Sequence, residues 1–136
     1  MKLNSEMQEK LIRAAIEARK WSYSPYSRYA VGAALLTRSG RIYDGVNIEN
    51  AAFPDTICAE RVAIFKAVSE GEREFEAIAV VTANAGTPCG SCRQVMAEFS
   101  LDMLVLIADT DGKVQRSMTV ADLLPGAFIP TDLQPG

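Results

Sequence analysis

Apolar side chains recur every three or four residues along the first part of the chain, at Met7, Leu11, Ala14, Ala15, Ala18 and Trp21. This spacing is typical of an amphipathic helix that packs one face on a core. Ser5 and Gln8 have the spacing of a capping box, so we expect the helix to begin there. The stretch Ser24-Pro25-Tyr26-Ser27 breaks the pattern and predicts a loop.

Two apolar runs follow at residues 29–37 and 41–46, and Arg38-Ser39-Gly40 separates them. A short turn between two such runs predicts an antiparallel hairpin. Residues 58–70 then carry apolar side chains around most of a helix circumference and end at Gly71. We therefore predict a buried central helix there.

Residues 77–82 and 103–108 are continuous runs rich in Val, Ile and Leu. Such runs are typical of strands that are covered on both faces. Residues 91–99 have a helical pattern, so the order strand, helix, strand predicts a parallel crossover. Asp111-Gly112 favours a tight turn, after which residues 113–118 are expected to return as an antiparallel strand.

The C-terminal stretch predicts a short helix at residues 120–124 and irregular structure at residues 125–136, where Pro and Gly are frequent. Strands that alternate with helices in this way are typical of the α/β class.

Composition limits the kinds of partner that the chain is expected to have. With 136 residues, 49% of them hydrophobic, and no repeats or linkers, one domain is expected over residues 1–136. Fourteen Lys and Arg against seventeen Asp and Glu give a net charge of -3, and the basic residues are not clustered, so no nucleic-acid partner is expected. No apolar run approaches the roughly 18 residues that span a bilayer, so we expect a cytoplasmic protein without a membrane partner.

All three cysteines lie in two short stretches, Cys58-Ala59-Glu60 and Pro88-Cys89-Gly90-Ser91-Cys92, and the chain has no histidine. An odd number of cysteines with one Cys-x-x-Cys favours reduced, metal-binding thiols over a disulfide framework. Three thiolates fit a zinc ion that keeps its fourth position open for water, as catalytic zinc sites do. Glu60 is close to such a metal without needing to bind it, and is therefore the candidate general acid and base.

The region around the cysteines adds candidates for supporting roles. Both stretches fall at predicted helix N-termini, where free amides and the helix dipole stabilise thiolates. Arg61 and Arg93 each directly follow a site residue, which makes them candidates to donate hydrogen bonds to the sulfurs, Arg61 more than Arg93. Asn47 and Glu49 lie on a polar loop that leads to Cys58, where small-molecule contacts are often placed.

Each of these motifs also has a simpler interpretation. The cysteines are also consistent with a redox pair and a separate core cysteine, or with a structural zinc closed by an Asp or Glu. The loop of Asn47 and Glu49 is also consistent with a solvated turn, and the arginines with surface residues. A zinc-stabilised binding module would bind metal without turnover.

Five stretches of the chain resemble the small homotetrameric cytidine deaminases. They are Ser-Pro-Tyr-Ser-Arg-Tyr-Ala-Val-Gly-Ala-Ala-Leu at 24–35, Asn-Ile-Glu-Asn-Ala-Ala at 47–52, Cys-Ala-Glu-Arg at 58–61, Pro-Cys-Gly-Ser-Cys-Arg-Gln at 88–94 and Leu-Leu-Pro-Gly-Ala-Phe at 123–128. A ligand followed two residues later by Glu, and then Pro-Cys-x-x-Cys, is the signature of zinc nucleobase deaminases. With the predicted elements, the resemblance implies a three-layer α/β/α fold with a mixed five-stranded sheet. Its first two strands form the antiparallel hairpin and its last strand is antiparallel.

The resemblance also implies a function, the zinc-dependent hydrolysis of cytidine and 2'-deoxycytidine to uridine and 2'-deoxyuridine with release of ammonia, in pyrimidine salvage. Residues matching Cys58, Cys89 and Cys92 bind one zinc ion per subunit in that family, and the residue matching Glu60 transfers protons. The family's substrate contacts match Asn47 and Glu49 at the ribose, Tyr29 against the nucleoside, the main chain of Ala59 at the base, and Phe128 from a neighbouring subunit of the homotetramer. The family usually has Phe where Tyr29 stands.

Two related activities compete with this one. A deaminase of another aminopyrimidine nucleoside, such as blasticidin S, resembles the same family and shares the zinc motif. The Asn-Ile-Glu-Asn loop favours a plain nucleoside. A polynucleotide deaminase would need a basic channel, which the composition does not suggest.

Overall fold

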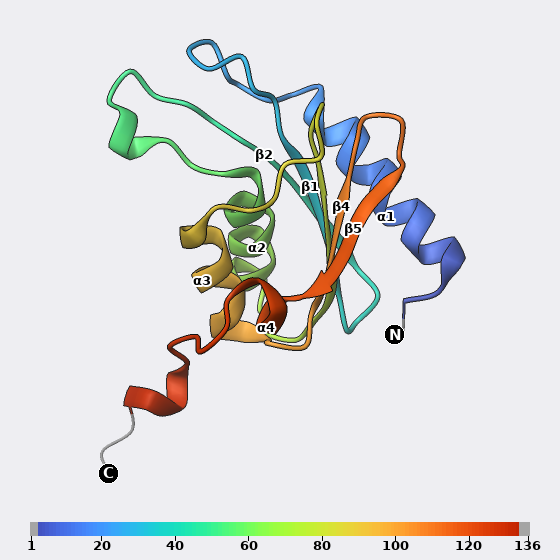
Figure 1. Cartoon of the computed structure of the whole chain (residues 1–136), viewed down its shortest axis with the longest axis vertical. Coiled ribbons are helices and arrows are strands. Elements are labelled where there is room, and N and C mark those ends of the chain that lie inside the picture. Colours follow the sequence, from blue (N-terminus) through green and yellow to red (C-terminus); the bar gives the residue numbers. More distant parts are fainter. Residues whose placement is uncertain (1–2, 134–136) are drawn as a thin grey trace.

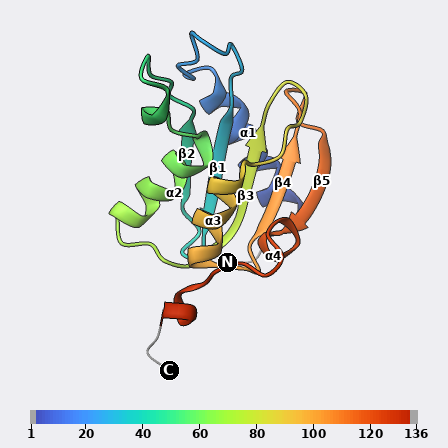
Figure 2. The same cartoon turned by 60° about the vertical axis from the view of Figure 1, so that its left-hand side comes forward.

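The computed structural model describes residues 3–133 and folds them around a five-stranded sheet with the order β2-β1-β3-β4-β5 (Figure 1). The strands are β1 (Gly32–Thr37), β2 (Ile42–Val46), β3 (Phe75–Val81), β4 (Leu104–Ala108) and β5 (Val114–Thr119). Only β3 and β4 pair in parallel, and β1–β2, β1–β3 and β4–β5 are antiparallel. The sheet is therefore mixed, with the hairpin and the antiparallel last strand that were predicted, and Figure 2 shows its strands side by side.

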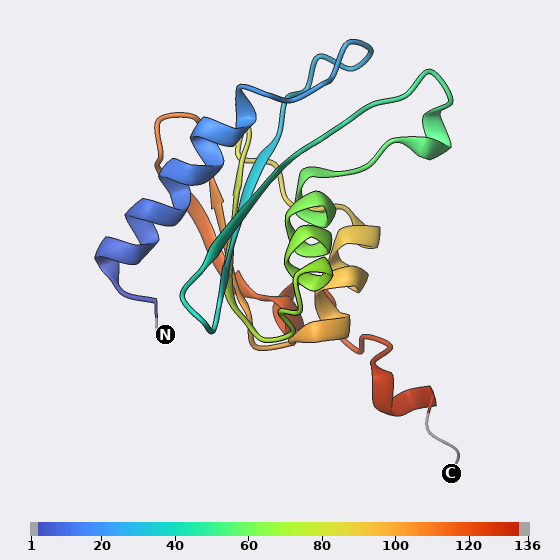
Figure 3. The same cartoon turned by 180° about the vertical axis from the view of Figure 1, so that it is seen from behind.

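Helices cover both faces of this sheet. The helix α1 (Ser5–Arg19) lies on one face, and α2 (Ala59–Ser69) and α3 (Gly90–Phe99) lie on the other, as Figure 1 and Figure 3 show from opposite sides. The helix α3 connects the parallel strands β3 and β4, which confirms the predicted crossover. The short elements are α4 (Val120–Leu123) and the 3-10 turns η1 (Phe53–Asp55) and η2 (Pro130–Leu133). The three-layer α/β/α fold is confirmed.

Two hydrophobic cores lie on the two faces of the sheet. Leu35, Ile64 and Ile78 belong to the core under α2 and α3, and Leu11 and Leu36 belong to the core under α1. Adjacent residues of β1 therefore enter opposite cores, because side chains alternate across a strand. This arrangement explains why the central strands are continuous apolar runs rather than alternating ones.

Several predicted details differ in the structure. The first helix is capped by Asn4, whose side-chain oxygen accepts the Met7 N–H at 2.8 Å, so the Ser5–Gln8 capping box was wrong. Trp21 lies beyond the helix end and is 81% exposed. The predicted central helix is not buried all round, since Phe65 on α2 is exposed. The C-terminal stretch, predicted to be irregular, contains η2.

Two loops project from one end of the sheet, residues 20–31 and 47–58, and Figure 3 shows them extending beyond the strands. They are joined by main-chain hydrogen bonds from Tyr23 N–H to the Asn47 carbonyl, 3.0 Å, and from Glu49 N–H to the Tyr23 carbonyl, 2.8 Å. The chain after α4 leaves the body at the opposite end (Figure 1). Among residues 3–133, no helix combines the length and apolar character needed to cross a membrane.

Candidate active site

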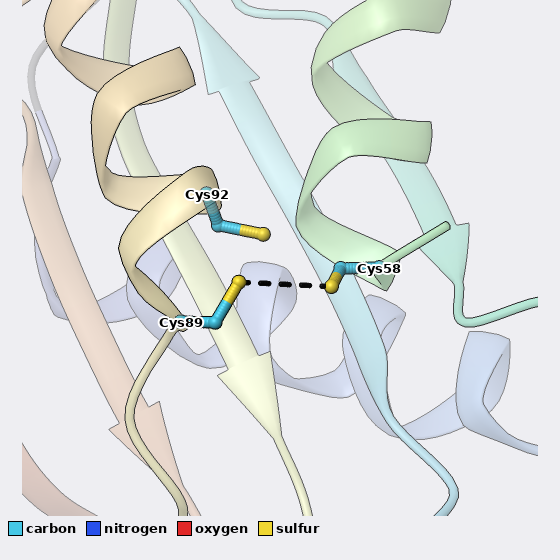
Figure 4. A group of neighbouring side chains, drawn as sticks. All are labelled: Cys58, Cys89 and Cys92. Carbon is cyan, nitrogen blue, oxygen red and sulfur yellow. Dashed lines mark hydrogen bonds between the residues drawn. The ribbon is translucent and has the colours of Figure 1, made fainter. Parts of the chain in front are cut away.

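The three cysteines meet at the starts of two neighbouring helices. Cys58 is the N-cap of α2, Cys89 is the N-cap of α3, and Cys92 lies in the first turn of α3. Figure 4 shows the three sulfurs pointing toward one another, and all of them lie within 4.8 Å of each other. A Cβ atom on Gly45 of β2 would lie 2.4 Å from the Ala59 carbonyl oxygen, so the absence of a side chain there allows α2 to begin close against the sheet.

The donor set fits a zinc ion. Thiolates are favoured zinc ligands, and a catalytic site uses three protein ligands. Cys92 is fully buried, Cys58 is half-buried and Cys89 is exposed, so the cluster has one closed side and one side open to the pocket. Within residues 3–133, no other group of three His, Cys, Asp or Glu ligand atoms comes together in this way.

The Cys58 and Cys92 sulfurs are joined by a hydrogen bond, and the proton stays mainly on Cys92. A hydrogen bond from the Cys92 thiol lowers the pKa of Cys58 to about 5 against the opposing effect of burial, and Arg61 contributes in the same direction. The same hydrogen bond, together with burial, raises the pKa of Cys92. Cys58 is therefore the thiolate of the pair, and a bound metal would displace the proton held by Cys92.

Arg61 is the positive group nearest to these sulfurs. Its Nη2 atom donates to Cys58 Sγ at 3.2 Å, and its Nε atom is buried without a hydrogen-bond partner. Burial by itself lowers the pKa of Arg61, but hydrogen bonds to the Cys58 and Cys92 sulfurs outweigh burial and raise that pKa. The guanidinium therefore stays charged and offsets the negative charge of the thiolates.

Arg93, the other arginine considered, makes different contacts. Its Nε atom donates to the Pro88 carbonyl at 2.8 Å, its Nη1 atom to the Leu123 carbonyl at 2.8 Å and its Nη2 atom to Thr87 Oγ1 at 3.2 Å. These bonds hold the segment before Cys89 and the end of α4 against α3, and they use the groups that were expected to face sulfur.

Glu60 is a buried carboxylate beside the cluster. It lies in the first turn of α2, is 4% exposed and lines the same pocket as Cys58 and Cys89. Burial raises the pKa of the Glu60 carboxyl to about 7, and the negative charge of Cys58 adds to this effect. A carboxyl group with a pKa near neutrality is suited to accept and return a proton.

The pocket above the cysteines has a volume of about 260 Å³ and lies between the two projecting loops and the segment before α3. It is lined by Ser27, Tyr29, Val31, Asn47, Glu49, Thr56, Ile57, Cys58, Ala59, Glu60, Val80, Thr82, Gly86, Thr87 and Cys89. The structure thus brings Tyr29, Asn47, Glu49 and Ala59 together with the catalytic candidate.

Asn47 and Glu49 are fixed by hydrogen bonds. Asn47 is 8% exposed, so it is not part of a solvated turn; its Nδ2 atom donates to the Tyr29 carbonyl at 2.8 Å, and its Oδ1 atom accepts from the Val31 N–H at 3.0 Å and from the Ser22 hydroxyl. One carboxylate oxygen of Glu49 accepts the N–H groups of Tyr26 and Ser27 at 3.0 and 3.1 Å, and the other accepts the Ser27 hydroxyl.

These contacts also affect the charge of Glu49. The hydrogen bond from the Ser27 side chain lowers the pKa of the Glu49 carboxyl, so it remains ionised at neutral pH. Sequence reasoning missed Ser22 and Ser27 as partners of Asn47 and Glu49. The only signal was their position in the loop that carries Tyr29.

Phe128 is not brought to the pocket of its own chain. It lies on the segment that follows α4, is 54% exposed, and its carbonyl accepts a hydrogen bond from Gln94 Nε2 at 2.8 Å. It is absent from the residues that line the pocket. The side chain is thus available on the surface rather than packed in its own core.

A group of three thiols with a buried glutamate two residues after the first is the arrangement of a zinc nucleobase deaminase. Residues 5–108 match the family described as the cytidine and deoxycytidylate deaminase zinc-binding region, and the chain belongs to that family.

The similar proteins cover almost the whole chain. A cytidine deaminase of Sporosarcina psychrophila is 53% identical over 128 residues, 92% of this chain and 93% of that protein. One of Halalkalibacterium halodurans is 52% identical over 126 residues, 90% of this chain and 95% of that protein. The 1.6 Å crystal structure of cytidine deaminase from Burkholderia pseudomallei has a TM-score of 0.85 at 44% identity, over 93% of this chain and 100% of that chain.

Proposed function

We propose that the protein deaminates cytidine and 2'-deoxycytidine hydrolytically, giving uridine and 2'-deoxyuridine with release of ammonia. The observation that carries this proposal is the meeting of three thiols, a buried glutamate and a polar loop in one pocket. The chain belongs to the zinc deaminase family, and relatives above 50% identity are named cytidine deaminases. Both findings favour cytidine over blasticidin S as the substrate.

Cys58, Cys89 and Cys92 would hold the zinc ion, which when bound supplies Lewis-acid activation of water. Glu60 would accept a proton from the attacking water and pass it to N3 of the cytosine ring. It would then accept the proton of the hydroxyl formed on C4 and pass it to the amine, which leaves C4 as ammonia. Its burial keeps bulk water from competing for these protons, and its pKa of about 7 matches both steps. Arg61 holds the Cys58 sulfur in place and balances its charge.

The nucleoside contacts follow from the walls of the pocket. Asn47 and Glu49 would bind the sugar hydroxyls, because both line the pocket and are held rigidly by the neighbouring loop. Ala59 is the first residue of α2, so its N–H has no partner within the helix and can donate a hydrogen bond to the cytosine base. The Tyr29 ring would lie against the nucleoside.

We also propose that residues 1–136 act as one domain within a cytoplasmic homotetramer in which Phe128 covers the pocket of a neighbouring subunit. Phe128 and Phe65 are exposed large apolar side chains, which a further protein surface would cover. A reducing compartment would keep the three thiols available for metal. Pyrimidine salvage is the role that such a reaction would serve.

An ultraviolet assay on purified, zinc-loaded protein tests the reaction. Cytidine and 2'-deoxycytidine are expected to be converted with equimolar ammonia, and blasticidin S far more slowly. The Glu60→Gln protein at the same concentration controls for contaminating deaminases. Faster turnover of blasticidin S than of cytidine would assign the protein to the other aminopyrimidine nucleosides. If zinc-replete protein turns over none of these compounds, it is a zinc-stabilised binding module and not a deaminase.

A further inference from the structure

The hydroxyl of Tyr29 joins two walls of the pocket that are distant in sequence. It donates a hydrogen bond to Asn84 Oδ1 at 2.7 Å, across 55 residues. Tyr29 belongs to the loop that approaches the nucleoside, whereas Asn84 belongs to residues 82–89, the segment that connects β3 to α3. The aromatic ring alone would fill the same space without making this connection.

Residues 82–86 form a compact turn around the Asn84 side chain. Asn84 Oδ1 also accepts the Thr82 hydroxyl at 3.3 Å, and Thr82 Oγ1 accepts the Gly86 N–H at 2.8 Å. Ala85 has a φ of 55°, which is unfavourable for a residue with a side chain. The turn therefore depends on its hydrogen bonds. From outside the segment, the Ala108 carbonyl accepts the Thr82 N–H at 3.3 Å, and the Tyr29 hydroxyl bonds the Asn84 side chain.

The Cys89 end of the same segment has a separate anchor. Arg93 holds Pro88 through its carbonyl and Thr87 through its hydroxyl. Loss of the Tyr29 hydroxyl would therefore loosen residues 84–86, including the pocket-lining Gly86, while Cys89 stays in place.

Gly86 lies directly against the Tyr29 hydroxyl. A Cβ atom at residue 86 would lie 2.3 Å from Tyr29 Oη, closer than any real contact, whereas the next atoms are Asn84 Oδ1 at 3.5 Å and Tyr29 Cζ at 3.6 Å. Those two distances are ordinary van der Waals contacts. Among the three nearest atoms, only the hydroxyl oxygen therefore excludes a Cβ atom at residue 86.

We propose that Tyr29 is a positioning residue whose hydroxyl, through Asn84, fixes the turn at residues 82–86, of which Thr82 and Gly86 line the nucleoside pocket, and that the tyrosine at 29 requires the glycine at 86. The role in nucleoside binding rests on the proposed function. Removing one neutral hydrogen bond typically changes an equilibrium by about two- to tenfold. Tyr29→Phe is therefore expected to raise KM for cytidine about two- to tenfold, with a smaller change in kcat and with zinc content unchanged.

The test is a set of single and double variants. Asn84→Ala should resemble Tyr29→Phe, the double variant should be no worse than either single one, and Asn84→Asp, which keeps the acceptor oxygen, should lose less than Asn84→Ala. Gly86→Ala should impair the protein that has Tyr29, and adding Tyr29→Phe to Gly86→Ala should restore KM toward the value of Tyr29→Phe alone. KM, kcat, zinc content and the thermal unfolding midpoint are measured for each.

Additive effects of Tyr29→Phe and Asn84→Ala, or equal damage from Gly86→Ala with and without Tyr29→Phe, would overturn the proposal. Loss of zinc in Tyr29→Phe would show that the hydroxyl supports the metal rather than the pocket wall. If the wild-type protein fails to deaminate cytidine, the proposed function fails. The thermal unfolding midpoints still test the pairing of Tyr29 with Gly86. They should be non-additive for Tyr29→Phe with Asn84→Ala, and Tyr29→Phe should restore the midpoint of Gly86→Ala. If Gly86→Ala does not fold alone, its recovery on adding Tyr29→Phe supports the pairing, and failure of both contradicts it.

Discussion

The three cysteines lie at the starts of two α-helices, whereas Asn47 and Glu49 lie on a loop beyond the sheet. The helices are fixed by the apolar core beneath them. The loop has no such core and is held by hydrogen bonds between side chains and main chain. The metal end of the site is thus positioned by packing and the nucleoside end by polar contacts. Damage to one end should leave the other largely intact.

The largest expected effect comes from Glu60, which lies between the two ends. Glu60→Gln preserves the shape of the side chain but cannot shuttle the proton, so kcat should fall by about a hundred- to ten-thousandfold. Zinc content, measured by elemental analysis, and KM should stay near wild-type values. Turnover close to normal would remove Glu60 from the mechanism.

At the metal end, Arg61→Ala removes the donor to Cys58 Sγ. Partners that orient metal ligands typically contribute about ten- to a hundredfold in metal affinity. Competition with a zinc chelator should show a weakening of that size, with nucleoside KM little changed once zinc is saturating. The matched control is Arg93→Ala, which touches no sulfur and should weaken zinc less; equal weakening by the two variants would contradict the distinction.

At the nucleoside end, Glu49→Ala should lower kcat/KM for cytidine by about tenfold or more, because a charged hydrogen bond to substrate is lost. Zinc affinity should be normal in the same sample. Glu49→Gln separates the two roles of this residue, since its amide oxygen can still accept the N–H groups of Tyr26 and Ser27. An unchanged kcat/KM in Glu49→Ala would confine Glu49 to holding the loop.

The smallest expected signal concerns Phe128. If it serves a neighbouring pocket, mixed tetramers of Glu60→Gln and Phe128→Ala chains should contain sites that pair an intact Glu60 with an intact Phe128. Random mixing of equal amounts predicts that about a quarter of the sites are intact. Activity above that of either parent, measured after co-refolding, supports sharing. Absence of recovery in tetramers shown to be mixed by mass spectrometry, or a monomer in sedimentation, would refute it.

The sequence predicted the metal end better than its surroundings. The Cys-x-x-Cys spacing and the two helix starts are local properties of the chain and indicated metal-binding thiols, whereas the joining of Cys58 to the other two cysteines in one zinc site came from the resemblance to the deaminase signature. Arg61 reaches the Cys58 sulfur from three residues away on the same helix, which a helical spacing also predicts.

Arg93 and Tyr29 were not predictable in the same way. One partner of Arg93, the Leu123 carbonyl, is thirty residues further on, and the partner of the Tyr29 hydroxyl, Asn84, is fifty-five residues away. Only the tertiary fold selects such partners. Asn4 was missed as the N-cap of α1 for a different reason. Ser5, the next residue, caps helices equally well, so the sequence alone does not decide at which of the two the helix begins.

The placement of Cys58 and Cys89 on helices separated by β3 also bears on how the chain folds. The two cysteines are 31 residues apart in sequence, and closing a flexible loop of that length costs on the order of 3 kcal/mol in chain entropy. In the folded chain this loop is already closed, because α2 and α3 pack in one hydrophobic core on the same face of the sheet (Figure 4). Zinc therefore meets a preorganised site and should join late, after the sheet has assembled. Refolding with a chelator present should then proceed at nearly the same rate, while unfolding becomes faster.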